Sequence, residues 1–147
     1  MIRKYQTKDT DALVLIWQNA NALAHSFLAD DFVAQVAQDM RNVYLPNAGT
    51  WVLEENETPL GFIALVGTEI GGLFLEPSFH GRGFGKALVD HAVATHGPLC
   101  VEVFEKNAIG RRFYDRYGFV ETERYVYEGS GEVTIKMVMS SSSHRST

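Results

Sequence analysis

The chain has little that would tie it to an oxidising compartment or to a membrane. Cys100 is the only cysteine among 147 residues, so no internal disulfide can form. No apolar run reaches the length of about 20 residues that a membrane-spanning helix needs, and residues 1–5 lack the apolar core of a signal peptide. We therefore expect a cytoplasmic protein without a membrane partner.

Basic charge is also scarce. Lys and Arg number 13 against 18 Asp and Glu, which gives a net charge of −5. Proteins that bind the nucleic-acid backbone carry a basic patch, so we expect no nucleic-acid partner. The surplus of acid favours a cationic ligand such as an amine. The basic pairs near possible ligand loops, Arg82 with Lys86 and Arg111 with Arg112, suit a small polyphosphate. The histidines lack the spacing of metal ligands, so no metal is expected.

The rest of the composition is that of an ordinary globular protein. Hydrophobic residues make up 46% of the chain and charged residues 21%, which allows one substantial core. No internal repeat or linker divides the chain. We expect a single domain over residues 1–140, followed by a Ser-rich and disordered tail over residues 141–147.

Hydrophobic spacing predicts an alternation of strands and helices. A Gly pair at 71–72 within one strand predicts a bulge or a close approach by another group, and Pro46 predicts a break after the second helix. The order predicts an α/β fold with one mixed, mostly antiparallel sheet flanked by helices. The expected strands cover residues 2–5, 50–54, 60–66, 70–75, 99–104, 120–127 and 133–139, and the expected helices cover 10–27, 30–43, 83–96 and 107–117.

A glycine-dense turn joins the strand that ends at Leu75 to the following helix. Glycines at 81, 83 and 85 allow the backbone to approach a ligand closely. The N–H groups at the start of the helix have no helical partner, and the helix dipole favours an anion there. The turn therefore predicts a phosphate cradle, although a tight strand-to-helix connection without a ligand is the open alternative.

Two common phosphate motifs do not fit this turn. A nucleoside-triphosphate loop would need Gly where His80 stands and Ser or Thr where Ala87 stands. A dinucleotide fingerprint would need a third Gly at the position of Lys86. Both nucleotide-binding alternatives are therefore disfavoured.

The turn resembles the pyrophosphate loop of the GCN5-related N-acetyltransferase family, whose pattern is Gln/Arg-x-x-Gly-x-Gly/Ala. Here residues 80–85 read His-Gly-Arg-Gly-Phe-Gly, with His80 departing at the first position. A second segment, residues 107–119, resembles the family's Asn-x-x-Ala/Gly-x-x-Phe-Tyr helix followed by Gly-Phe. Because both motifs lie in the family's order and spacing, the chain is identified as a member, of the small single-domain bacterial type.

The resemblance implies a fold in which the strands ending at 75 and 104 splay apart in a V. Pantetheine of acetyl-coenzyme A (acetyl-CoA) would lie in the gap against the backbone of Leu73 and Leu75, and its pyrophosphate would meet the N–H groups of residues 81–86. Asn107 would contact the pantetheine arm. The implied binding residues for this co-substrate are Leu73, Phe74, Leu75, Gly81, Arg82, Gly83, Phe84, Gly85, Lys86, Asn107 and Tyr114.

The resemblance also implies transfer of the acetyl group to a primary amine, by direct attack in a ternary complex. Tyr114 matches the family's partner for the departing thiolate. His25, at the end of the first helix, is the expected general base because its pKa suits neutral pH, with Glu69 and Glu102 as weaker alternatives. The acceptor, a small molecule or a peptide, and the choice between monomer and homodimer stay open. So do a different acyl-CoA donor and a catalytically silent CoA-binding module.

Overall fold

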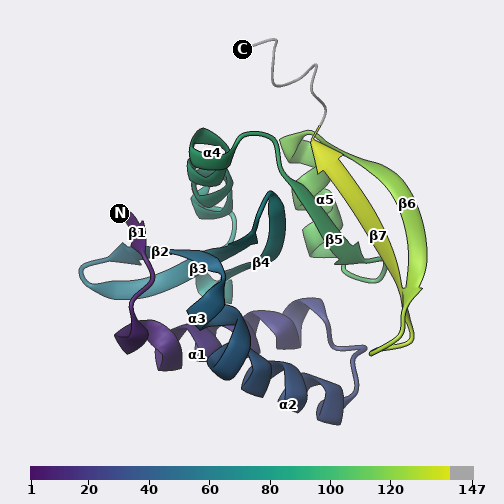
Figure 1. Cartoon of the computed structure of the whole chain (residues 1–147), viewed down its shortest axis with the longest axis horizontal. Coiled ribbons are helices and arrows are strands. Elements are labelled where there is room, and N and C mark those ends of the chain that lie inside the picture. The colour runs from purple at the N-terminus through teal and green to yellow at the C-terminus, as the bar shows by residue number, and fades with distance from the viewer. Residues whose placement is uncertain (140–147) are drawn as a thin grey trace.

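A computed structural model describes residues 1–139; the tail expected at 141–147 lies outside the described residues. Its strands build one seven-stranded sheet in the order β1-β2-β3-β4-β5-β7-β6 (Figure 1). All neighbouring strands are antiparallel except β4 and β5. The strands are β1 (Ile2–Lys4), β2 (Gly49–Glu55), β3 (Thr58–Val66), β4 (Glu69–Leu75), β5 (Cys100–Phe104), β6 (Phe119–Tyr127) and β7 (Glu132–Met139). The four long helices are α1 (Thr10–Ala24), α2 (Asp30–Asp39), α4 (Phe84–His96) and α5 (Ala108–Tyr117).

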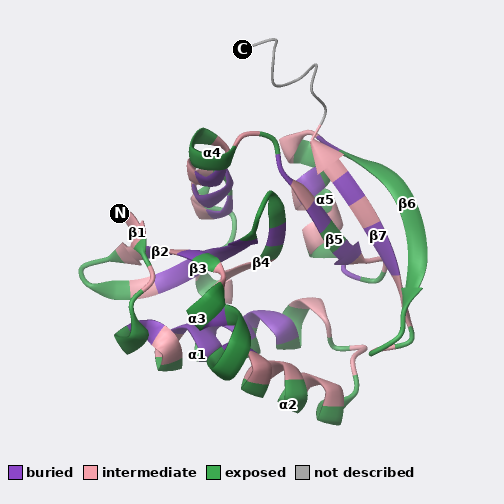
Figure 2. Ribbon diagram, in the orientation of Figure 1, coloured by how far each residue is buried: buried purple, intermediate pink, exposed green. Residues whose placement is uncertain are grey.

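Helices cover both faces of the sheet, as the sequence predicts (Figure 1). On one face, α1 and α2 pack on a cluster that includes Leu13, Trp17 and Phe62. On the other, α4 and α5 pack on a larger cluster that includes Leu88 and Tyr114. Buried residues lie along α4 and along the central strands, and they make up this second cluster (Figure 2). Within residues 1–139, no helix is long and apolar enough to cross a membrane.

The expected V-shaped opening lies between β4 and β5. These two strands pair only through Glu69 with Cys100 and Ile70 with Val101. Beyond Ile70 they diverge, and the rest of β4 and β5 lines a cavity instead of pairing. The sheet is thus two paired halves joined at a short neck (Figure 1).

The glycine pair in β4 produces the predicted bulge. Ala64 of β3 lies opposite Gly72, whereas Leu65 lies opposite Ile70, so Gly71 is an extra residue without a partner on β3. Because side chains alternate along a strand, one extra residue changes which face each later side chain occupies. Leu73 therefore packs in the same cluster as Ile70, three residues earlier.

Three expectations about the helices require correction. The first helix ends at Ala24 rather than at residue 27, because the backbone of His25 leaves helical geometry. The second helical segment continues through a π-turn (Met40–Tyr44) into α3 (Leu45–Asn47), so Pro46 does not break it. The wider turn avoids the clash that the proline ring would make with the carbonyl four residues earlier. In α5, the spacing of Ile109, Phe113 and Tyr117 in the sequence predicts a buried face, but Ile109 is 40% exposed and Tyr114 is the buried residue of this helix.

Candidate active site

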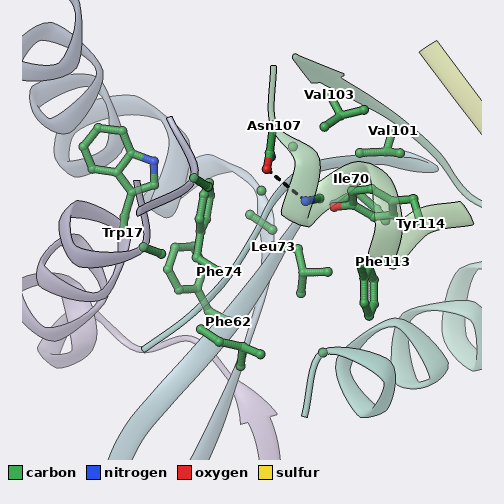
Figure 3. Close-up of a pocket in the computed structure, with 18 of the residues that line it drawn as sticks. Trp17, Phe62, Ile70, Leu73, Phe74, Val101, Val103, Asn107, Phe113 and Tyr114 are labelled. Atoms are coloured by element: carbon green, nitrogen blue, oxygen red, sulfur yellow. Dashed lines mark hydrogen bonds between the residues drawn. The ribbon is translucent and has the colours of Figure 1, made fainter. Parts of the chain in front are cut away.

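The gap between β4 and β5 opens into one large cavity of about 1370 Å³. Residues from both helical layers and from both splayed strands line it (Figure 3). Aromatic rings, including Trp17 and Phe74, gather on one side, and Asn107 and Tyr114 lie on the other (Figure 3). All the expected binding residues line the cavity except Arg82. The fold therefore brings these residues, which come from distant segments of the sequence, around one cavity.

The inner edge of β4 presents free backbone groups to the cavity. The Glu76 N–H donates to the Leu60 carbonyl at 2.8 Å, so the pair Glu76–Leu60 is hydrogen-bonded. In an antiparallel pair, hydrogen-bonded and non-hydrogen-bonded positions alternate. With the observed register, the backbone N–H and C=O groups of Phe74 point toward β3, whereas those of Leu73 and Leu75 point away from it. Their N–H and C=O groups therefore point into the gap, where an extended ligand arm can pair with them as a strand would.

The change of face at Gly71 is what turns these groups toward the gap. The Thr68 carbonyl accepts from the Cys100 N–H at 2.9 Å, so the backbone N–H and C=O groups of residues 68 and 70 point toward β5. Without an extra residue, positions 72 and 74 would continue that pattern. The bulge shifts this alternation by one residue, which turns the backbone groups of Leu73 and Leu75 toward the gap.

The glycine-rich turn forms a cradle of N–H groups at the start of α4. Gly81 and Gly83 have φ of +79° and +81°, a conformation that glycine adopts without strain. The first helical bond of α4 runs from the Ala87 N–H to the Gly83 carbonyl at 3.0 Å, so the N–H groups of residues 84–86 have no helical partner. A Cβ added at Gly81 or Gly83 would meet no atom within 4 Å, so the space before the cradle is open. These residues fit a pyrophosphate.

The basic side chains near the cradle have different roles. Lys86 lines the cavity, and its ammonium lies 2.9 Å from Asp90 one helical turn away. Asp90 also accepts a hydrogen bond of 2.6 Å from the Tyr117 hydroxyl, which ties α5 to α4. Arg82, by contrast, lies over the rings of Phe79 and Phe84, with its guanidinium 5.3 Å from each centroid. Arg82 therefore supports the turn from outside the cavity.

Tyr114 lies at the cavity wall on the side of α5 (Figure 3). Its ring packs edge-on against Phe113 and Phe119, each with centroids 5.2 Å away. Burial raises the pKa of the phenol above its ordinary value, so the hydroxyl keeps its proton. Within residues 1–139 it makes no hydrogen bond, and it is not among the buried polar atoms shielded from solvent. The hydroxyl can therefore donate to a ligand.

Asn107 and His25 are hydrogen-bonded to each other across the cavity wall. Asn107 caps α5 by accepting from the Gly110 N–H at 2.9 Å, the bond drawn dashed in Figure 3. Its Nδ2 lies 3.0 Å from Nε2 of His25, and the other ring nitrogen, Nδ1, lies 2.8 Å from Oδ1 of Asn21. Burial lowers the pKa of His25 to about 4. The role of His25 as a general base remains a prediction.

Sequence reasoning missed Asn21 as part of this site. Its spacing of four residues before His25 on a helix is the signal that predicts contact between the two side chains. The aromatic residues that enclose His25 were also missed, because Phe104 comes from β5 and only the fold brings it to 5.4 Å from the imidazole. The alternative bases, Glu69 and Glu102, both line the cavity, and Glu102 accepts from the Tyr125 hydroxyl at 2.8 Å. No group of three or more potential metal ligands occurs in the described part of the chain.

A splayed sheet with a free inner edge and a phosphate cradle at its end defines the class of acyl-CoA N-acyltransferases. A family model described as "Acetyltransferase (GNAT) domain" matches residues 46–121. Since this is half of the chain, the protein belongs to the GNAT acetyltransferase family and is an acetyl-CoA-dependent N-acetyltransferase. The expected family and fold are thereby confirmed.

Relatives along nearly the whole chain agree with this assignment. Peptidyl-lysine N-acetyltransferase YjaB of Salmonella typhimurium is 31% identical over 132 residues, which cover 89% of this chain and 90% of that protein. Peptidyl-lysine N-acetyltransferase YiaC of Escherichia coli is 32% identical over 81% of this chain and 82% of its own length. The solution structure of apo YjaB from Escherichia coli has a TM-score of 0.85 at 30% identity, covering 94% of this chain and 95% of that one.

A more distant structure shares the fold in a complex. The PaiA N-acetyltransferase of Thermoplasma acidophilum, solved with coenzyme A, has a TM-score of 0.74 at 18% identity. The alignment covers 93% of this chain and 98% of that one. The likeness shows that the arrangement of strands and helices is common to both.

Proposed function

We propose that this chain acetylates the side-chain amine of peptidyl lysine, by direct attack of the amine on the thioester of acetyl-CoA while both are bound. The observation that carries the acetyl-CoA part is the inner edge of β4, whose free backbone groups at Leu73 and Leu75 lead toward the glycine cradle. The names of the relatives YjaB and YiaC, both peptidyl-lysine N-acetyltransferases, support the acceptor.

In this proposal, the chain holds the donor mainly through backbone groups. The pantetheine arm pairs with Leu73 and Leu75, the pyrophosphate accepts from the N–H groups of residues 81–86, and Asn107 contacts the arm. Phe74 contributes a backbone position between the two leucines, while its ring packs at 6.5 Å from Trp17. Because recognition is by backbone groups, we expect that no single side chain dominates binding.

The amine must lose a proton before it can attack. With a pKa of about 10.4, a lysine amine is neutral about one part in 10³ near pH 7.4, which costs about 4 kcal/mol. Glu69 pairs with Cys100 at the closed end of the V, and Glu102 lies two residues further along β5. Both line the cavity, and their carboxylates attract the ammonium. Either carboxylate can take the proton through water.

Tyr114 acts at the other end of the reaction. A C–N bond forms, the C–S bond breaks, and the sulfur leaves as a thiolate. A thiol has a pKa near 8.5 and the buried phenol titrates above its ordinary value, so complete proton transfer from Tyr114 is uphill. Tyr114 therefore stabilises the thiolate by a hydrogen bond that strengthens as charge develops.

The test is acetylation of defined amines. Purified protein is incubated with acetyl-CoA and a short lysine peptide whose N-terminus is blocked, and free thiol and acetylated product are measured. We expect acetyl-lysine as the product. The control peptide carries norleucine in place of lysine and has a free N-terminus, and we expect its kcat/KM to be lower. Faster acetylation of a polyamine would overturn the lysine assignment, and absence of transfer to every amine would favour the silent CoA-binding module. A faster reaction with succinyl-CoA would identify a different acyl donor.

A further inference from the structure

Asn21, His25 and Asn107 form a hydrogen-bonded row that joins α1 to the cap of α5. His25 and Asn107 are 82 residues apart in the sequence. The distances along the row are 2.8 Å from Asn21 Oδ1 to His25 Nδ1 and 3.0 Å from His25 Nε2 to Asn107 Nδ2. Both asparagines are buried, with 4% and 8% of their surface exposed. Buried amides need partners, and the imidazole supplies one to each.

The positions of the protons in this row follow from one backbone group. The Gly110 N–H can only donate, so the Asn107 atom facing it is the carbonyl oxygen Oδ1. The amide nitrogen of Asn107 must then face His25, and its N–H donates to Nε2. Since Nε2 accepts, the neutral ring carries its proton on Nδ1, which donates to Asn21. All three side chains therefore have one consistent orientation.

The surroundings of the ring favour this neutral form. Phe27 and Phe104 pack edge-on against the imidazole at 5.8 and 5.4 Å between centroids. Asn21 from α1 and Asn107 from the cap of α5 are uncharged, and Lys106 lies over the Phe27 ring at 5.7 Å. Burial alone lowers the pKa of His25, which makes the ring a poor acceptor for a proton from an ammonium group. Protonation would also set two N–H groups against each other at Nε2.

We propose that His25 is a positioning residue that holds the Asn107 amide in one orientation toward the cavity, with Asn21 fixing the imidazole tautomer. The inference rests on the proposed function, in which Asn107 contacts the pantetheine arm. The Asn107 oxygen is engaged by Gly110 and one of its two N–H bonds by His25. The remaining N–H is left for the ligand, so Asn107 donates to a pantetheine carbonyl.

The binding test is a double-mutant cycle. The Kd for acetyl-CoA is measured by calorimetry for His25→Leu, Asn107→Ala and the double variant, with His25→Gln as the conservative control. Gln can still present a carbonyl oxygen to the Asn107 N–H. We expect His25→Leu to weaken binding about threefold to tenfold, the range of one hydrogen bond. His25→Gln should bind within about twofold of the wild type. In the Asn107→Ala background, His25→Leu should cause no further loss of affinity.

The same variants separate this inference from the proposed function. Weaker binding by Asn107→Ala together with unchanged binding by His25→Leu would overturn the positioning role alone. Unchanged binding by Asn107→Ala would remove the proposed pantetheine contact, and the positioning role with it. If His25→Gln and His25→Leu lose kcat equally, keep the wild-type Kd and shift the acidic limb of the pH–rate profile, His25 is the general base and the positioning role is wrong.

A second readout needs no activity. The ¹⁵N chemical shifts of the imidazole report its tautomer in the folded wild-type protein. We expect the proton on Nδ1 from pH 8 down to about pH 5, and a mixture of tautomers in Asn21→Ala, where Nδ1–H has lost its acceptor. A proton on Nε2 in the wild type would overturn the inference.

Discussion

Packing places the ring of Tyr114 and leaves its hydroxyl available. Phe113 and Phe119 enclose the ring, and the hydroxyl has no hydrogen-bond partner within residues 1–139. A side chain held in this way needs no rearrangement when charge develops beside it, and this is how a preorganised donor lowers a barrier.

The substitution Tyr114→Phe removes this donor and little else. We expect a loss of about ten- to a thousand-fold in kcat, or about 1.4–4 kcal/mol, because the hydrogen bond matters mainly in the transition state. The Kd for acetyl-CoA should stay close to that of the wild type. Steady-state kinetics and calorimetry measure the two effects.

Tyr117 provides the matched control for this change. It lies one helical turn away on α5 and donates to Asp90 at 2.6 Å. Tyr117→Phe should change kcat by no more than about twofold. A Tyr114→Phe enzyme with normal kcat, under conditions where chemistry limits the rate, would show that Tyr114 only packs.

At the scale of elements, matched substitutions of two turn glycines distinguish the effect of backbone strain from the loss of ligand binding. Gly83 and Gly67 both have positive φ, +81° and +63°, and a Cβ added at either meets no atom within 4 Å. Val at either position therefore carries a similar strain of about 1–3 kcal/mol. Only Gly83 lies at the cradle, since Gly67 is in the turn between β3 and β4 and does not line the cavity.

We expect Gly83→Val to lose at least tenfold in affinity for acetyl-CoA, while Gly67→Val keeps the wild-type Kd. Urea unfolding measures the stability of both variants, and calorimetry measures the affinity. Equal affinity in the two folded variants would show that the N–H groups of residues 81–86 do not bind the pyrophosphate.

The sequence predicts those elements that depend on local signals. The glycine-rich turn with Gly81 and Gly83 and the bulge at Gly71 depend on local backbone conformation, and each is found where expected. The π-turn before Pro46 was missed because its wider geometry depends on how the helix end packs, with Met40 and Leu45 both buried. The contact of His25 with Asn107 was missed because only the completed fold brings α1 and α5 together.

At the scale of the whole molecule, the partly buried imidazole of His25 makes stability depend on pH. His25 titrates near pH 6.5 in the unfolded chain and at about 4 in the folded protein. Between these values the unfolded state binds a proton that the folded state does not, so the free energy of unfolding falls as pH decreases through this window. Above pH 6.5 the contribution is complete.

Urea unfolding of the wild type and of His25→Gln at several pH values between 7.5 and 4 measures this contribution. The wild type should lose up to about 3 kcal/mol more than the variant over that range. Parallel pH dependence in the two proteins would show that His25 is not protected from protonation. Because the Gln amide can still hydrogen-bond to Asn107 but cannot take up a proton, the two proteins differ mainly in the charge at residue 25.

The short neck between the two halves of the sheet leaves β4 as an edge strand within the molecule. Gly72 and Phe74 donate toward β3, whereas Leu73 and Leu75 face the gap, so amide hydrogen exchange in the free protein should alternate between protected and unprotected along one strand. Binding of acetyl-CoA should slow exchange at Leu73 and Leu75 and leave Gly72 and Phe74 almost unchanged. Uniform exchange along the strand would mean that the ligand does not complete the sheet. In the proposed complex the co-substrate takes the place of a missing strand, so each catalytic cycle would open and close the sheet itself.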